Sequence, residues 1–346
     1  MVVLGTDAHK RTHTIVAADE AGAELDRVTV AATPEGHLRV VKWAARFECR
    51  RWAIEDCRHL SRRLETDLLA AGETVVRVPP KMMAGVRRSA RTRGKSDPID
   101  ALAVARAALR EPDLPMARLD GPAREVKLLV DYREGLIRER TAVQNRLRWR
   151  LHELEPGFDP SPGSLDVYKT LDRVEDVLNA HQGVVADLAR AELTRIREIT
   201  RQARQLEHDI ADRVGKLAPS LLRLPGCGAL TAAKLIGEAA DITRFKNRNA
   251  YAMWAGTAPI PVWSGNQDRF RLNRGGNRQT NAAIHRIVIT QIRIHQEAKT
   301  FIARRLAENS TKREALRALK RRITDVVYRT MISDTHHHQA AQPRAA

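Results

Sequence analysis

The chain opens with VVLGTDAHKRTHTIVAADEAGAELDRVTVAA, residues 2–32, and this stretch decides the fold of its first part. The apolar run Val2–Thr6 and the β-branched segments Thr12–Ala18 and Arg27–Ala32 have the length and composition of strands. Turn-forming residues at 19–22 separate the second segment from the third. Residues 2–32 therefore predict three short strands in hairpin succession.

Helices and strands alternate from there to residue 110. Apolar residues recur at helical spacing in three segments, and two short β-rich segments lie between them. The helices are expected at Pro34–Phe47, Leu60–Leu69 and Pro98–Leu109, and the strands at Arg51–Ile54 and Thr74–Val78. The order β-β-β-α-β-α-β-α predicts an α/β domain with a mixed sheet over residues 1–115, rather than a doubly wound parallel sheet.

The pattern changes after residue 116. Glu125–Glu155 is almost free of Gly and Pro, a second such stretch runs over Leu165–Leu217, and a Pro- and Gly-rich break at 156–163 separates them. These stretches predict two long helices that form a coiled-coil arm over residues 116–218. Further helices, one expected at Gln279–Ala307, predict an all-α C-terminal domain over 219–332. Residues 333–346, with three consecutive histidines, are expected to form a disordered tail.

The charge of the chain indicates a polyanionic partner. Among 346 residues there are 60 Lys and Arg against 42 Asp and Glu, which gives a net charge of +18. A GC-rich genome explains an excess of Arg over Lys, but it does not explain the net charge. Nucleic acid is the expected partner, and an anionic membrane surface is the alternative. With 14 aromatic residues, we expect contacts to the nucleic-acid backbone rather than base stacking.

Other classes of protein are disfavoured. No apolar run approaches the roughly 18 residues of a membrane span, and the N-terminus lacks a signal-peptide pattern. Three cysteines without a C-x-x-C pair indicate neither a disulfide framework nor a zinc site. We therefore expect a cytoplasmic protein.

Four carboxylates occupy positions that suit a metal site. Asp7 and Glu55 end the first and fourth predicted strands, and Asp97 and Asp100 open the helix after the fifth. If the first and fourth strands are neighbours, these acids converge into an oxygen site suited to two Mg²⁺ or Mn²⁺ ions for phosphoryl transfer. The alternative for Asp97 and Asp100 is helix capping, since Asp followed by Pro98 is typical of a helix start.

These residues carry a family resemblance. The strings Leu4-Gly5-Thr6-Asp7, Ala53-Ile54-Glu55 and KSDPIDA at 95–101 resemble the acidic tetrad of the DEDD transposases of insertion-sequence family one-ten. These enzymes are bridge-RNA-guided serine recombinases with a RuvC-like, ribonuclease H-type N-terminal domain. The resemblance extends over residues 1–330 and implies that Asp7, Glu55, Asp97 and Asp100 are catalytic metal ligands.

The C-terminal motifs follow the same family. Ile242–Phe245 precedes the string AGTAP at 255–259, and Ser264 follows in a loop flanked by Pro and Gly. By itself a loop serine is most often a turn residue. The resemblance implies that Ser264 is the nucleophile and forms a phosphoserine link to DNA. It also implies a non-coding bridge RNA and a homodimer or homotetramer, because the serine and the tetrad are joined between subunits.

Several residues are candidates for nucleic-acid contacts. LPGCG at 224–228 between two helices resembles a helix-hairpin-helix, whose glycines let backbone N–H groups approach phosphate, although an ordinary tight turn is the alternative. The basic run at 87–95 suits a phosphate backbone, and its alternative is a solvated loop. Lys10 could contact phosphate, and its alternative is an ordinary surface position. The full set is Lys10, Arg87, Arg88, Arg91, Arg93, Lys95, Gly226, Gly228, Arg269, Arg271, Arg274 and Arg278.

The resemblance and the charge together predict a transposase that performs RNA-guided, site-specific DNA strand cleavage and exchange on donor and target DNA. One alternative is a RuvC-like, metal-dependent DNA junction nuclease in which water replaces the serine. The other is a nucleic-acid-binding protein without enzymatic activity, in which the acids only cap helices.

Overall fold

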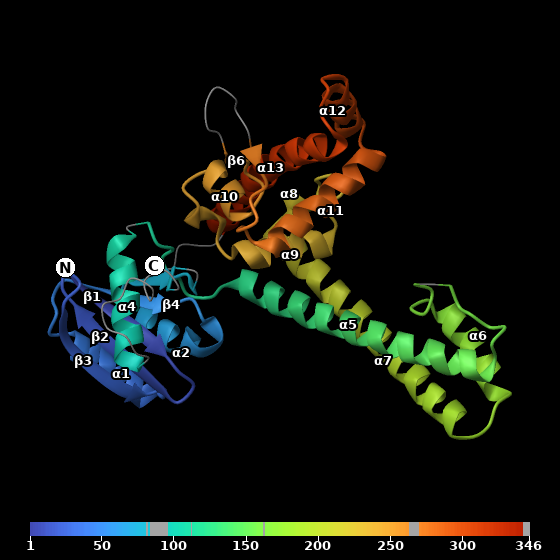
Figure 1. The fold of residues 1–346 in the computed structure, drawn as a ribbon, viewed down its shortest axis with the longest axis horizontal. Coiled ribbons are helices and arrows are strands. Elements are labelled where there is room, and N and C mark those ends of the chain that lie inside the picture. The colour runs from blue at the N-terminus through green and yellow to red at the C-terminus, as the bar shows by residue number, and fades with distance from the viewer. Residues whose placement is uncertain (81, 84–95, 112, 162, 263–269, 342–346) are drawn as a thin grey trace. The chain divides into compact units, whose positions relative to one another are not determined.

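The structure is a computed structural model that describes residues 1–346 apart from 81, 84–95, 112, 162, 263–269 and 342–346. The chain divides into two compact units, Met1–Asp120 and Gly121–Ala346 (Figure 1). The two units are described separately below. Among the described helices, none combines the length and the hydrophobicity that crossing a bilayer requires.

A five-stranded sheet organises the first unit. Its strands are β1 (Val2–Ala8), β2 (Thr12–Ala18), β3 (Glu24–Ala31), β4 (Arg50–Glu55) and β5 (Val75–Val78). They lie in the order β3-β2-β1-β4-β5, with β1, β2 and β3 antiparallel and with β4 parallel to both β1 and β5. The prediction of a mixed sheet is confirmed, and this strand order is that of the ribonuclease H-like fold.

Helices cover both faces of this sheet. Leu4, Trp52 and Ile54 pack in one core cluster with residues of α1 (Pro34–Ala44) and α2 (Arg58–Ala70). Val3 and Ala53 pack in another cluster with α4 (Asp97–Arg110), which lies over the sheet in Figure 1. Neighbouring residues of a strand thus enter opposite cores, as the two-residue period of a strand requires.

A glycine lets α4 lie close to β1. A Cβ atom on Gly5 would lie 2.2 Å from the carbonyl oxygen of Ala101 and 2.5 Å from the backbone nitrogen of Ala105. Both alanines are completely buried. Because no side chain separates the two backbones, the part of α4 that follows Asp97 and Asp100 lies directly against β1.

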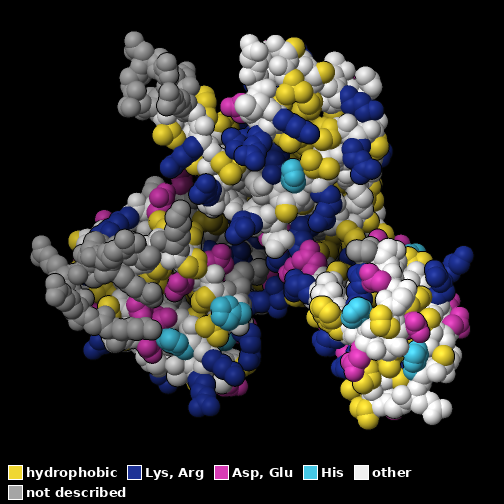
Figure 2. Space-filling view, turned by 45° about the vertical axis from the view of Figure 1, so that its right-hand side comes forward, with side chains coloured by type: hydrophobic (Ala, Val, Ile, Leu, Met, Phe, Trp, Pro, Cys, Tyr) yellow, Lys and Arg dark blue, Asp and Glu magenta, His cyan; other side chains and the backbone are white. Residues whose placement is uncertain are grey.

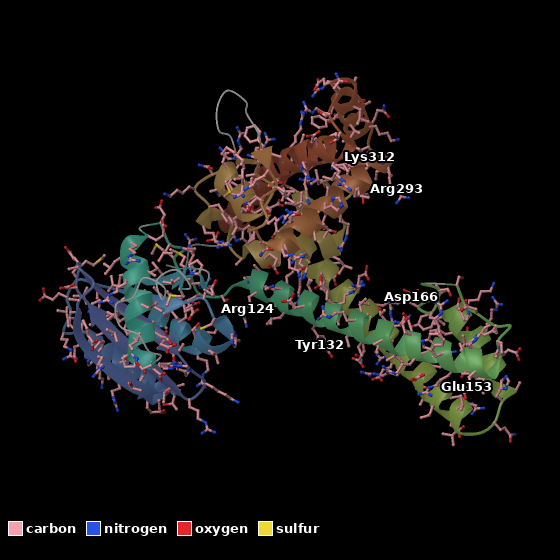
Figure 3. All side chains as sticks on the ribbon, viewed as in Figure 1. Arg124, Tyr132, Glu153, Asp166, Arg293 and Lys312 are labelled. Atoms are coloured by element: carbon pink, nitrogen blue, oxygen red, sulfur yellow. The ribbon has the colours of Figure 1, made fainter. Side chains whose placement is uncertain are left out.

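An antiparallel hairpin of long helices begins the second unit. It consists of α5 (Pro122–Leu154) and α7 (Val184–Leu217), with α6 (Tyr168–Asn179) between them in sequence. Ion pairs cross from α5 to α7 along the hairpin, among them Arg133–Glu207 at 2.8 Å and Glu139–Arg195 at 2.6 Å. Figure 3 shows Arg124 and Glu153 near opposite ends of α5.

The expected single helix over Leu165–Leu217 is wrong. The structure divides it into α6 and α7, and Gly183 precedes α7 with φ of 96°. This left-handed conformation is strained for other residues, so the glycine allows the chain to turn there. The turn brings Leu171 and Leu178 of α6 into a buried cluster with Leu147 and Leu151 of α5.

The rest of the second unit is mainly helical. Its elements are α8 (Pro219–Leu222), α9 (Ala229–Ala239), a 3₁₀ turn (Ile242–Arg244), α10 (Arg248–Trp254), the two-residue strands β6 (Ile260–Pro261) and β7 (Phe270–Arg271), α11 (Arg278–Ile294), α12 (Gln296–Ala307) and α13 (Lys312–Ala341). A second large core joins residues of α5, α7, α9, α11 and α13, for example Val126, Ile210, Leu235, Ile284 and Val327.

Two further expectations need correction. The helix expected over Gln279–Ala307 is interrupted at His295, whose backbone is extended with φ of −105° and ψ of 121°. The tail expected to be disordered from residue 333 is helical as far as Ala341. Asp334 explains this difference, since it is 4% exposed and accepts hydrogen bonds from the backbone nitrogens of Ser220 and Leu221, each at 3.2 Å.

Candidate active site

The sheet places Asp7 and Glu55 on neighbouring strands. β1 and β4 are parallel, and their register pairs Gly5 with Ala53 and Thr6 with Ile54, so that Asp7 and Glu55 come next on the two strands. Gly5 and Ala53 both face α4. Because side chains two residues apart share a face, Asp7 and Glu55 also face α4.

The first turn of α4 supplies the other two acids. Asp97 and Asp100 both lie in this turn, which begins after the N-cap residue Ser96. The Asp97 side chain is 51% exposed, whereas Asp100 is 8% exposed. The helix-capping alternative for Asp97 is wrong in its simplest form, since the cap position belongs to Ser96.

The pKa of Asp7 is influenced by two of the other three acids. Burial raises the pKa of the Asp7 carboxyl, the nearby His9 lowers it, and Asp100 and Asp97 raise it further. The charges of the three carboxylates are therefore mutually unfavourable. A cation among them would offset the cost of holding these charges together.

His9 was not among the residues predicted for this site. Its Nε2 lies 3.0 Å from Asp7 Oδ2 and 3.4 Å from Asp97 Oδ1. Ligand atoms of Asp7, His9 and Asp97 lie within 4.8 Å of one another, which is close enough to bind one metal ion. The only signal in the sequence was its position two residues after Asp7.

The predicted helix-hairpin-helix turn lies between α8 and α9. Gly226 has φ of 82°, and a Cβ there would lie 3.0 Å from Thr290 Cβ and 3.1 Å from the carbonyl oxygen of Ile287. Gly226 therefore seats the turn on α11, where Gln291 also donates a hydrogen bond to the carbonyl oxygen of Pro225 at 2.8 Å. Gly228 precedes α9 and has open space around its Cβ position.

Two glycines pack the AGTAP segment against the start of α11. A Cβ on Gly276 would lie 2.2 Å from the backbone nitrogen of Gly256, and Gly256 has φ of 69°. Asn281 donates to the carbonyl oxygens of Ala255 and Gly256 at 2.9 and 3.0 Å, and Lys320 donates to Asn281. Sequence reasoning missed Asn281 and Lys320, because their partners are distant in the chain.

The segment that contains Ser264 is flanked by paired strands. In β6 and β7, Ile260 pairs with Arg271 and Pro261 with Phe270. Several predicted residues lie outside the described part of the chain: Ser264, Arg269, Arg87, Arg88, Arg91, Arg93 and Lys95. Of the remaining candidates, Lys10, Arg271, Arg274 and Arg278 are all exposed.

Basic side chains cover the C-terminal helices. Figure 2 shows Lys and Arg spread over the visible face of this region, with few acidic side chains among them. In this region the guanidinium groups of Arg304 and Arg322 lie 5.4 and 5.6 Å from the ring centre of Phe301. This surface suits a phosphate backbone.

Two family models match the chain, and together they cover more than half of it. Residues 4–156 match a transposase model of the DEDD type, and residues 218–303 match the model of the transposase IS116/IS110/IS902 family. The chain belongs to this transposase family. The matched ranges include all four acids and Ser264, and the family is one of DNA-processing enzymes.

Curated relatives match this transposase over nearly their whole length. The insertion element IS116 44.8 kDa protein of Streptomyces clavuligerus is 25% identical over 98% of this chain and 96% of its own. The IS900 42 kDa protein of Mycobacterium paratuberculosis is 25% identical over 100% and 96%. Among solved structures, T. thermophilus RuvC in complex with a Holliday junction substrate is 17% identical, covers 34% of this chain and 99% of its own, and has a TM-score of 0.27.

Proposed function

We propose that this transposase cleaves and exchanges DNA strands site-specifically, with Asp7, Glu55, Asp97 and Asp100 as ligands of Mg²⁺ or Mn²⁺ and Ser264 as the nucleophile. The observation that carries the proposal is the register of β1 and β4, which turns Asp7 and Glu55 toward the first turn of α4. Hard oxygen ligands in such a cluster are those that Mg²⁺ and Mn²⁺ prefer.

The residues present fit a divalent cation. Asp7 is only 13% exposed and has a raised pKa, so its buried charge is costly without a positive partner. A bound cation supplies charge stabilisation at the phosphate that reacts. The four carboxylates would hold the cation, and the close packing of α4 on Gly5 fixes the helix that carries Asp97 and Asp100.

The serine step conserves the number of phosphodiester-type bonds. The Oγ–phosphorus bond of Ser264 forms as the bond from phosphorus to the DNA 3′-oxygen breaks, and the 3′-oxygen leaves as a hydroxyl. In the second step a 3′-hydroxyl attacks the phosphoserine, which restores the serine and joins a new strand. Because the bond energy is retained, the exchange needs no external energy source.

Three finer features are part of the same proposal. A non-coding bridge RNA selects donor and target DNA, and the active protein is a homodimer or homotetramer. The resemblance described in the sequence analysis implies both features, and the net charge of +18 supports binding to nucleic acid. The exposed Arg271, Arg274 and Arg278 are proposed to contact nucleic-acid phosphates near the serine.

The test is a search for a covalent protein–DNA adduct on a denaturing gel. The full chain is incubated with Mg²⁺, element-end DNA and RNA transcribed from the non-coding end of the element. We expect an adduct with the native protein and with Ser161→Ala, which changes an exposed loop serine. Ser264→Ala and Asp7→Ala should each abolish it.

The other outcomes separate the alternatives. Cleavage without an adduct, unaffected by Ser264→Ala but lost in Asp7→Ala, would identify a metal-dependent junction nuclease that uses water. Full activity of Asp7→Ala would overturn the role of the acidic site in both enzymatic functions.

A further inference from the structure

The imidazole of His9 contacts two carboxylates that come from different elements. His9 follows β1, and its backbone nitrogen donates to the carbonyl oxygen of Thr12 at 2.9 Å, which fixes the turn into β2. From there, the single atom Nε2 lies 3.0 Å from Asp7 Oδ2 and 3.4 Å from Asp97 Oδ1. The His9 side chain is 48% exposed, so a metal ion from solvent can reach it.

These distances match those between neighbouring ligands of one metal ion. Ligands at about 2.1 Å from an octahedral ion, at right angles to each other, lie about 3 Å apart. The separations of His9 from Asp7, 3.0 Å, and from Asp97, 3.4 Å, are close to this value, and all three ligand atoms lie within 4.8 Å of one another. Glu55 and Asp100 do not belong to this group.

We propose that His9 Nε2 is a metal ligand, so that one cation position of the acidic site has mixed nitrogen and oxygen ligands. This inference rests on the proposed function, which assigns the metal to the four carboxylates alone. Imidazole is a softer ligand than carboxylate and favours transition metals. The position formed by Asp7, His9 and Asp97 therefore prefers Mn²⁺ to Mg²⁺, whereas an all-carboxylate position discriminates less.

Pulsed electron paramagnetic resonance of the Mn²⁺-loaded full chain gives a direct test, because it detects imidazole nitrogen bound to the ion. We expect nitrogen coupling in the native protein and in His208→Asn, which changes a histidine that is 73% exposed in the second unit. His9→Asn should lose the coupling. Its Mn²⁺ affinity, measured by calorimetry, should fall about tenfold or more, and its Mg²⁺ affinity should change much less.

The outcomes separate this inference from the function on which it rests. If native protein binds Mn²⁺ without nitrogen coupling, or if the coupling persists in His9→Asn, His9 is not a ligand. If His9 is not a ligand but Asp7→Asn loses Mn²⁺ binding, the metal site formed by the carboxylates is still supported. If Asp7→Asn binds Mn²⁺ as the native chain does, both the ligand role and the metal site are overturned. The native spectrum decides the question even if a variant fails to fold.

Discussion

Two histidines are buried on the face of the sheet opposite α4. His13 of β2 and His37 of α1 are each 1% exposed, and their rings stack with centres 5.2 Å apart. His37 Nδ1 lies 2.5 Å from Asp67 Oδ2 of α2. Burial, with smaller contributions from His37 and His9, lowers the pKa of His13 to about 4.

This shift predicts that the stability of the first unit depends on pH. Since the folded pKa of about 4 lies below the usual value of 6.5, the unfolded chain binds more protons between these values. The stabilising contribution is complete above pH 6.5 and is lost as the pH falls toward 4. Its size is about 3 kcal/mol. Amide hydrogen exchange in β1 and β2, measured from pH 7.5 to pH 4.5, should follow this loss.

The matched variant is His13→Phe, which keeps a stacked ring and removes the titration. Its stability should change less between pH 6.5 and pH 4.5 than that of the native chain. An unchanged slope would show that another group is responsible.

Gly5 controls how closely α4, which carries Asp97 and Asp100, packs against β1. Gly5→Ala would place a Cβ against the backbone of Ala101 and Ala105, so α4 must move away from β1. We expect a loss of stability of about 3 kcal/mol and weaker divalent-cation binding, since Asp97 and Asp100 move with the helix. Thermal unfolding and calorimetry measure the two effects.

The control for Gly5→Ala is Gly121→Ala. Gly121 has φ of −122° and open space around its Cβ position, so this change should be nearly neutral. Equal effects of the two substitutions would contradict the role assigned to close packing.

At the scale of elements, the helical hairpin has a small core of its own. The cluster of Leu147, Leu151, Leu171 and Leu178 is separate from the larger core that joins the other end of the hairpin to α9 and α11. An ion pair between α6 and α7, Asp172–Arg197 at 2.8 Å, is partly exposed to water and adds little stability. The apolar cluster therefore holds α6 against α5 and α7.

Leu147→Ala should loosen this end of the hairpin selectively. The side chain is completely buried, so its truncation costs about 2–5 kcal/mol. Hydrogen exchange should accelerate in α6 and the adjoining turns of α5 and α7, and not in α9 or α11. Leu128→Ala, on the same helix but 52% exposed, is the control and should change little. Uniform acceleration over the second unit would show that the two cores are coupled.

For the whole molecule, the excess of positive charge predicts a strong salt dependence. Binding that neutralises several phosphates releases counterions, so DNA affinity should fall about a thousandfold or more between 50 and 200 mM salt. Fluorescence anisotropy with a labelled duplex measures this slope. The double change Arg271→Ala and Arg274→Ala should reduce the slope by about 2, whereas Arg201→Ala on α7 should leave it unchanged. A flat salt profile of the native chain would contradict backbone recognition.

The sequence was sufficient wherever the signal is local. Alternation and β-branched residues located the five strands of the first unit, and Gly- and Pro-free stretches located α5 and most of α7. The local signal failed between Asn179 and Val184 and at His295, where short non-helical segments interrupt an otherwise helical pattern. It failed again after residue 333, because Asp334 is held by backbone groups more than a hundred residues earlier.

The sequence by itself determined the charge, the mixed sheet and the positions of four acids at element ends. Only the tertiary structure decided which of these side chains share a face, because that depends on the register between β1 and β4 and on the packing of α4 against Gly5. The same holds for His9, which reaches Asp97 from a turn 88 positions earlier in the chain. Such contacts join segments that are distant in the chain, and local sequence propensities do not determine which distant segments come together.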